Sequence, residues 1–189
     1  VEVLQASPLR VTPRCDAFGR CGGCRLQHLD PVAQVEAKQQ VLLDALQGIG
    51  SVVPAEILAP IVNESTWGYR RKARLGAKFV VKKDKMLVGF RERSSSFLVE
   101  MEECHVLHPK VGFALRQLAD LINSLEINRQ LPQIEVAMDD ERCVLIFRVL
   151  EEPGVSDREK LRSFGEAQGF HIYLQPGGPD TVRPLGTPV

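Results

Sequence analysis

Three cysteines lie within ten residues near the start of the chain, in the run PRCDAFGRCGGC. They are Cys15, Cys21 and Cys24, and a fourth cysteine, Cys104, stands far downstream. Thiolates at such short spacing are typical of zinc or iron–sulfur sites, where a remote residue completes the coordination shell. The glycines between them supply the backbone freedom that a tight wrap around a metal requires. The four cysteines therefore predict a metal site, with Cys104 as the distant ligand.

The spacing of the cysteines does not by itself decide between zinc and an iron–sulfur cluster. Structural zinc sites usually combine two short pairs of ligands, whereas here three cysteines cluster and one is distant, which favours an iron–sulfur cluster. Zinc remains an alternative because His28, His105 and His108 lie close to the candidate ligands. A secreted disulfide scaffold is disfavoured, since it would be small and cysteine-dense with an even number of cysteines. The fifth cysteine, Cys143, lies in an apolar run and is expected to be a buried strand residue.

Charge is unevenly distributed along a chain that is neutral overall. Residues 67–93 hold ten basic and two acidic side chains, a net of +8, so the remainder carries a net of −8. One basic face on an acidic body suits a polyanion such as RNA. Aromatic residues within this segment, Trp67, Tyr69 and Phe90, could stack on unpaired bases. A solvated strand surface is the alternative. The candidate RNA contacts are Arg70, Arg71, Lys72, Arg74, Arg91 and Arg93.

Alternation of polar and apolar residues from 69 to 80 predicts a strand whose basic side chains share one face. The polar KKDK stretch is expected to form a turn. Residues 86–93 form the returning strand, with Arg91 and Arg93 on one face. A further short strand, SFLVEME, leads directly to Cys104. The basic hairpin and the metal site should therefore be physically linked through that ligand.

The remaining pattern predicts an α+β fold, namely a small, mostly antiparallel sheet with two to three helices and an N-terminal cysteine-rich metal loop. Asp30 and Pro31 begin a helix that ends near Gly50, and Ser156 with Glu159 form a capping box for another. A further helix, expected at 109–125 from about Pro109, carries an apolar stripe. The other expected elements are the last helix, which ends near residue 169, and strands at 133–138, 143–150 and 170–174.

No catalytic constellation is evident in this chain. It has no glycine-rich nucleotide loop after a strand, and the acids at 139–141 fit a solvated turn. At 189 residues with 44% hydrophobic content, the chain can bury one moderate core. We found no apolar stretch long enough for a membrane span and no leader, and with reduced thiols this indicates a cytoplasmic protein. Membrane partners are not expected.

Three segments, PRCDAFGRCGGCRLQHL, WGYRRKARL and GFRERSSSFLVEMEEC, closely resemble the iron–sulfur branch of the bacterial RNA 5-methyluridine methyltransferases that modify 23S rRNA. The resemblance implies a [4Fe-4S] cluster held by Cys15, Cys21, Cys24 and Cys104, with a structural, RNA-orienting role. It also implies a three-part parent enzyme. A TRAM domain comes first, this cluster domain is central, and a Rossmann-like domain binds S-adenosylmethionine and carries the nucleophilic cysteine and the base.

No position of this chain matches the family's nucleophile, base or cofactor residues, so we expect a fragment that binds 23S rRNA but does not methylate it alone. S-adenosylmethionine would bind only in the missing catalytic domain. A zinc-stabilised nucleic-acid-binding module and a small electron-transfer iron–sulfur domain remain alternatives. The expected segments are the end of a TRAM-like domain or a linker (1–9), the iron–sulfur loop (10–30), a helix that packs on the missing catalytic domain (31–50), the central α+β RNA-recognition domain (51–175) and a linker to the missing domain (176–189).

Overall fold

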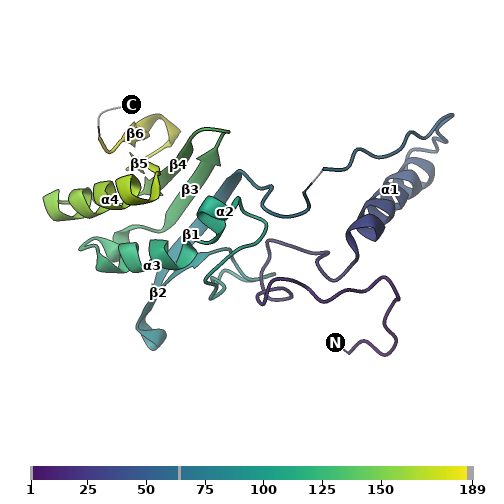
Figure 1. Ribbon diagram of the computed structural model, residues 1–189, viewed down its shortest axis with the longest axis horizontal. Coiled ribbons are helices and arrows are strands. Elements are labelled where there is room, and N and C mark those ends of the chain that lie inside the picture. The colour runs from purple at the N-terminus through teal and green to yellow at the C-terminus, as the bar shows by residue number, and fades with distance from the viewer. Residues whose placement is uncertain (1, 64, 187–189) are drawn as a thin grey trace.

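A mixed sheet of six strands forms the centre of the part of the chain that the computed structural model describes, residues 2–63 and 65–186 (Figure 1). The strands are arranged in the order β2-β1-β3-β4-β5-β6. Their bounds are Lys72–Val80 for β1, Lys85–Gly89 for β2, Gln133–Met138 for β3, Cys143–Arg148 for β4, His171–Gln175 for β5 and Arg183–Pro184 for β6.

The expected α+β class is confirmed, and most strand pairs are antiparallel. One pair, β4 with β5, is parallel, so the sheet is mixed. Parallel neighbours need a crossover connection, and the helix α4 (Val155–Gln168) provides it. The expected strands at 133–138, 143–150 and 170–174 correspond to β3, β4 and β5.

Four α-helices occur in the described residues, against the two to three expected. They are α1 (Pro31–Gly48), α2 (Pro109–Gly112), α3 (Leu115–Ser124) and α4. The extra helix arises because the helix predicted for 109–125 is interrupted at Phe113 and Ala114. The apolar stripe predicted for residues 109–125 is nevertheless buried, since α3 packs against β2. Helix α4 packs against β5 and contributes to the same core. The stripe residues in that core are Val111, Leu115, Leu118, Ile122 and Leu125.

The hairpin of β1 and β2 shows the predicted alternation, but both strands are shorter than expected. Leu75 and Ala77 are buried, while Lys72, Arg74 and Lys78 are exposed. Strand β1 begins at Lys72 rather than at residue 69, so the side chain of Arg70 lies before the strand. Strand β2 ends at Gly89, whose φ of 156° takes the backbone out of the strand.

The prediction that Arg91 and Arg93 share a strand face is therefore wrong. Both residues follow β2 in a tight loop that turns through Ser94, where φ is 61°. The predicted strand SFLVEME is also absent from the described residues. Only an isolated bridge between Arg91 and Leu98 remains, because the loop folds back on itself within a few residues.

Helix α1 begins as predicted, since the Oδ1 atom of Asp30 accepts a hydrogen bond of 2.9 Å from the amide of Val32. It stands apart from the sheet at the end of two extended connections (Figure 1). Ala33 is its buried residue, whereas Val41 and Leu42 are largely exposed. Its expected packing on a catalytic domain stays a prediction. No helix within the described residues is long and apolar enough to cross a membrane.

Two expectations near the C-terminal end need correction. The capping box is wrong, because α4 begins at Val155 with Gly154 as its N-cap, and Ser156 lies inside the helix. Part of the segment expected to be a linker is packed structure. It contains a 3₁₀ turn (Pro179–Thr181), strand β6 and the buried side chain of Leu185. Residues 187–189 lie outside the described part, and the domain assignments themselves remain predictions.

Candidate metal centre and basic surface

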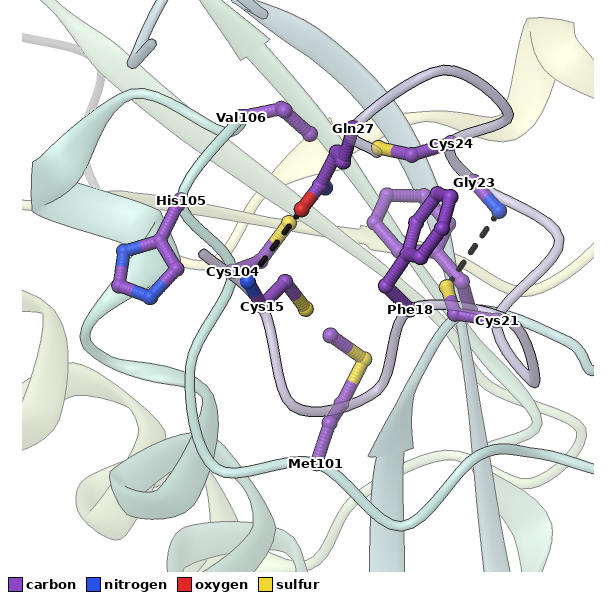
Figure 2. A pocket seen from close by; sticks show the side chains of 11 residues that line it. Cys15, Phe18, Cys21, Gly23, Cys24, Gln27, Met101, Cys104, His105 and Val106 are labelled. Atoms are coloured by element: carbon purple, nitrogen blue, oxygen red, sulfur yellow. Dashed lines mark hydrogen bonds between the residues drawn. The ribbon is translucent and has the colours of Figure 1, made fainter. Parts of the chain in front are cut away.

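The four cysteines singled out in the sequence line one cavity, although Cys104 is at least eighty residues away from the others along the chain (Figure 2). The cavity is tight, since the centre of a water-sized sphere can occupy only about 10 Å³ of it. All the cysteines are free thiols, and Cys143 lies elsewhere, buried in β4 as predicted. The other lining residues are Phe18, Gly23, Gln27, Phe90, Met101, His105 and Val106.

The first three cysteines are positioned by a chain of local turns. The amide of Phe18 donates to the carbonyl of Cys15 at 2.9 Å, and the amide of Cys21 donates to Ala17 at 2.9 Å. Gly19 joins these turns with a φ of 92°, a region that glycine adopts without strain. The side chain of Gln27 accepts a hydrogen bond from the amide of Cys15 at 3.3 Å, which holds the returning chain against the first cysteine (Figure 2).

Cys104 is held in place by the short helix α2. Its amide donates to the carbonyl of Gly112 at 2.8 Å. A Cβ atom at Gly112 would lie only 2.3 Å from the carbonyl oxygen of Cys104, so the two backbones can approach this closely only because residue 112 lacks a side chain. The remote cysteine thus reaches the cavity from a segment that is anchored in the main core.

The sulfur atoms of the two buried cysteines accept hydrogen bonds from backbone amides. The amide of Gly23 donates to Cys21 Sγ at 3.3 Å (Figure 2), and those of Leu107 and Val106 donate to the sulfur of Cys104. Burial raises the pKa of both thiols, and the amide donors oppose this effect. The neighbouring thiols at Cys15 and Cys24 raise each pKa further. Burial and the neighbouring thiols therefore both favour the protonated form of these two cysteines.

The four thiols that line this cavity are donors of the kind that bind either zinc or an iron–sulfur cluster. A lone zinc ion draws its ligand sulfurs to about 2.3 Å. In the described part of the chain, no three His, Cys, Asp or Glu side chains are placed to hold one ion in this way. The four cysteines nevertheless line one common cavity.

The three histidines that were considered as possible zinc ligands contact other residues. His28 lies beside the ring of Phe18, with centroids 5.5 Å apart. His105 pairs with Glu103 through Nε2 at 3.1 Å, and its ring points away from the sulfurs in Figure 2. His108 caps α2, since its Nδ1 accepts a hydrogen bond from the amide of Lys110. This arrangement gives the histidines local structural roles.

The cysteine loop is joined to the basic segment, but not through a strand at 96–102 as expected. The amide of Gly22 donates to the carbonyl of Arg91 at 2.9 Å, and the amide of Arg93 donates to Arg20 at 2.7 Å. The guanidinium of Arg93 also donates to the carbonyl of Cys24 at 3.2 Å. The loop that follows β2 is therefore hydrogen-bonded directly to the cysteine loop.

Arg70 makes a second link between the two regions. Its guanidinium donates to the carbonyl of Gly23 at 3.4 Å and lies 5.6 Å from the ring centroid of Phe90. Among the predicted stacking residues, Phe90 is thus covered by an arginine and lines the cavity. Trp67 packs edge-on to His105, whereas Tyr69 stays about half exposed.

Acidic residues from distant segments face part of the predicted RNA-contact set. Arg71 pairs with Asp140 at 2.8 Å, and Arg74 pairs with Glu135 on the neighbouring strand at 2.9 Å. Lys72 is exposed and has no ion pair within residues 2–63 and 65–186. The basic charge counted along the sequence is therefore partly neutralised in the fold. Sequence order gave no sign of these pairs, because they depend on strand register.

Comparison with known proteins identifies the relatives of this chain. Over 98% of its length it is 51% identical to 23S rRNA (uracil(1939)-C(5))-methyltransferase RlmD of Stenotrophomonas maltophilia, and equally identical to that of Nitrosococcus oceani. The chain is homologous to part of the 23S rRNA (uracil-C5)-methyltransferases. The resemblance inferred from the cysteine loop and the basic segment is thus confirmed.

The homology extends along the whole chain but not along the whole of the relatives. The corresponding methyltransferase of Alkalilimnicola ehrlichii is 47% identical over 100% of this chain. The chain spans only 41–42% of the length of these relatives. No family model matches the sequence.

A solved structure shares the fold. The tRNA (uracil-54, C5)-methyltransferase of Pyrococcus abyssi, crystallised with S-adenosyl-L-homocysteine, matches 92% of this chain with a TM-score of 0.59. The match covers 39% of that protein, and the sequences are 23% identical. At this identity the likeness concerns the fold alone.

Proposed function

We propose that this chain is the iron–sulfur, RNA-binding part of an S-adenosylmethionine-dependent methyltransferase that forms 5-methyluridine in 23S rRNA. The observation that carries the proposal is the 51% identity to such methyltransferases over nearly the entire chain. We further infer that the catalytic and cofactor-binding residues belong to the length of those relatives that this chain does not match, since it spans 41% of it. The chain alone is then expected to bind rRNA without methylating it, in the cytoplasm where rRNA is modified.

Cys15, Cys21, Cys24 and Cys104 are the proposed ligands of a [4Fe-4S] cluster. Support comes from the shared cavity and from the amide donors to two of the sulfurs. When bound, the cluster supplies a rigid cross-link between four sulfurs from two distant parts of the chain. The residues around it then keep the cysteine loop and the loop after β2 in register.

Arg70, Arg71, Lys72, Arg74, Arg91 and Arg93 are the proposed RNA contacts. Their roles differ according to the surroundings of each side chain. Lys72 is exposed and ready to meet a phosphate, while Arg71 and Arg74 would have to exchange a carboxylate for one. Arg70 and Arg93 are tied to the cysteine loop, so they connect cluster and RNA surface.

The test for the cluster is anaerobic purification followed by iron and zinc analysis. A brown protein with about four irons per chain is expected. Cys104→Ser should abolish the iron, whereas Cys143→Ser, a matched control in the core, should retain it. A colourless protein with one zinc ion per chain would instead support the alternative of a zinc-stabilised nucleic-acid-binding module. A reversible redox couple without RNA affinity would support an electron-transfer domain.

The test for RNA binding uses an rRNA hairpin that contains the uridine numbered 1939 in the names of the relatives. Lys72→Ala should weaken binding and reduce the salt slope by about one unit, as expected for one lost phosphate contact. No binding of this hairpin by the iron-loaded chain would contradict the proposed function. Methyl transfer by the chain alone would contradict the assignment of catalysis to the unmatched length.

A further inference from the structure

Phe97 is a large apolar side chain that the fold leaves in solvent. Its exposed fraction is 65%, although its neighbour Val99 is only 1% exposed. Leaving such a ring in water forgoes about 1.5–3 kcal/mol of burial free energy. The sequence pattern had placed Phe97 in a strand leading to Cys104, where its exposure could not be foreseen.

The exposure of Phe97 is built into a closed loop. The amide of Glu92 donates to the carbonyl of Phe97 at 2.8 Å, and the amide of Phe97 donates to the hydroxyl of Ser95 at 3.0 Å. The guanidinium of Arg91 donates to the carbonyl of Ser96 at 2.8 Å. These bonds fix the backbone on both sides of the ring, so the ring is presented by an ordered loop.

Arginines surround this loop and the cysteine loop bonded to it. Arg93 and Arg20 are joined through their main chains, and the Arg93 guanidinium lies on the carbonyl of Cys24, next to Arg25. All four arginines of this surface are exposed, and none has an ion pair within the described residues. They are Arg20, Arg25, Arg91 and Arg93.

We propose that Phe97 is a stacking site for an unpaired base of the bound RNA, with the surrounding arginines contacting its phosphates. An aromatic ring on the same loop as arginines without ion pairs matches the combination by which proteins hold single-stranded nucleic acid. An apolar protein partner would leave those charges without partners. The inference rests on the proposed function and adds a contact outside the residues selected from the sequence.

The test measures how tightly the iron-loaded chain binds the rRNA hairpin and a series of hairpins with one abasic site each. Phe97→Ala should weaken binding about tenfold or more, because base stacking on an aromatic side chain contributes about 1–3 kcal/mol. The salt slope should not change, since no phosphate contact is lost. Phe97→Trp should restore the affinity. One abasic hairpin should bind the wild type and Phe97→Ala equally.

Leu150→Ala is the matched control, because Leu150 is 58% exposed and lies beyond β4, away from the cysteine loop. It should bind RNA like the wild type, and the iron content of every variant should be unchanged. If Phe97→Ala bound every hairpin as the wild type does while Arg93→Ala bound weakly, the stacking role would be wrong and the proposed function would stand. Failure of the wild type to bind any hairpin would count against the proposed function itself.

Discussion

The amide of Cys104 donates a hydrogen bond of 2.8 Å to the carbonyl oxygen of Gly112, and the two backbones lie too close for a side chain between them. This contact sets the position of the proposed fourth ligand from within the main core. The geometry of the cysteine cavity therefore depends on a residue that could never bind a metal.

Gly112→Ala should disturb both the fold and the cavity. Its Cβ would lie 2.3 Å from the carbonyl oxygen of Cys104, so the backbone must shift. We expect a loss of about 1–3 kcal/mol in the free energy of unfolding, as for other overpacked sites, together with reduced iron content. Urea denaturation and iron analysis measure the two effects. Gly178→Ala is the control, because its Cβ would meet no atom within 4 Å, and equal behaviour of the two variants would refute the prediction.

Asp157 is a buried carboxylate that joins α4 to the end of α3. Its oxygens accept hydrogen bonds from the amides of Glu126 at 2.9 Å and Ile127 at 3.1 Å. Asp157→Ala leaves these amides without partners, so we expect a loss of about 1–3 kcal/mol of stability. Asp157→Asn keeps one acceptor and should lose less. Thermal unfolding distinguishes the variants, and equal melting temperatures for Asp157→Ala and the wild type would rule out this role.

If Arg74 contacts RNA as proposed, Glu135 competes with RNA for it, because its carboxylate lies 2.9 Å from the guanidinium. Glu135→Gln should release the arginine and tighten binding of the rRNA hairpin by up to about fivefold, the scale of one exposed ion pair. The salt slope should steepen by about one unit. Glu141→Gln, which also removes one exposed negative charge, should change affinity much less. Equal gains in both variants would indicate a general charge effect instead.

Glu100 bridges Lys83 in the 3₁₀ turn between β1 and β2 and Lys85 at the start of β2, and its hydrogen bonds to these lysines lower its pKa from 4.5 to about 2. A carboxylate with a lowered pKa stabilises the fold above its ordinary pKa, and this contribution is lost as pH falls towards 2. Glu100→Gln should therefore melt below the wild type at pH 6. The difference should shrink below pH 4.5. A constant difference across this range would contradict the assignment.

Most of the secondary structure could be predicted because it depends on local patterns. Polar and apolar alternation located β1, the strands at 133–138 and 143–150 correspond to β3 and β4, and Asp30 with Pro31 located the start of α1. The predictions failed where contacts between residues far apart in the sequence determined the structure. Ser156 and Glu159 resemble a capping box, yet the fold uses neighbouring Asp157 to bind amides 30 and 31 positions away.

The four cysteines and the homology they indicated could be found from residue type and spacing alone, since metal ligands are chemically restricted. The charge of the basic segment could be counted in the same way. The sequence could not show whether that charge is free of ion pairs, because Asp140 and Glu135 reach Arg71 and Arg74 only through tertiary contacts. The exposure of Phe97 likewise depends on where one loop closes. Spacing along the chain determined which groups could bind a cluster, whereas the approach of distant backbones decided where those groups stand and which charges remain available to RNA.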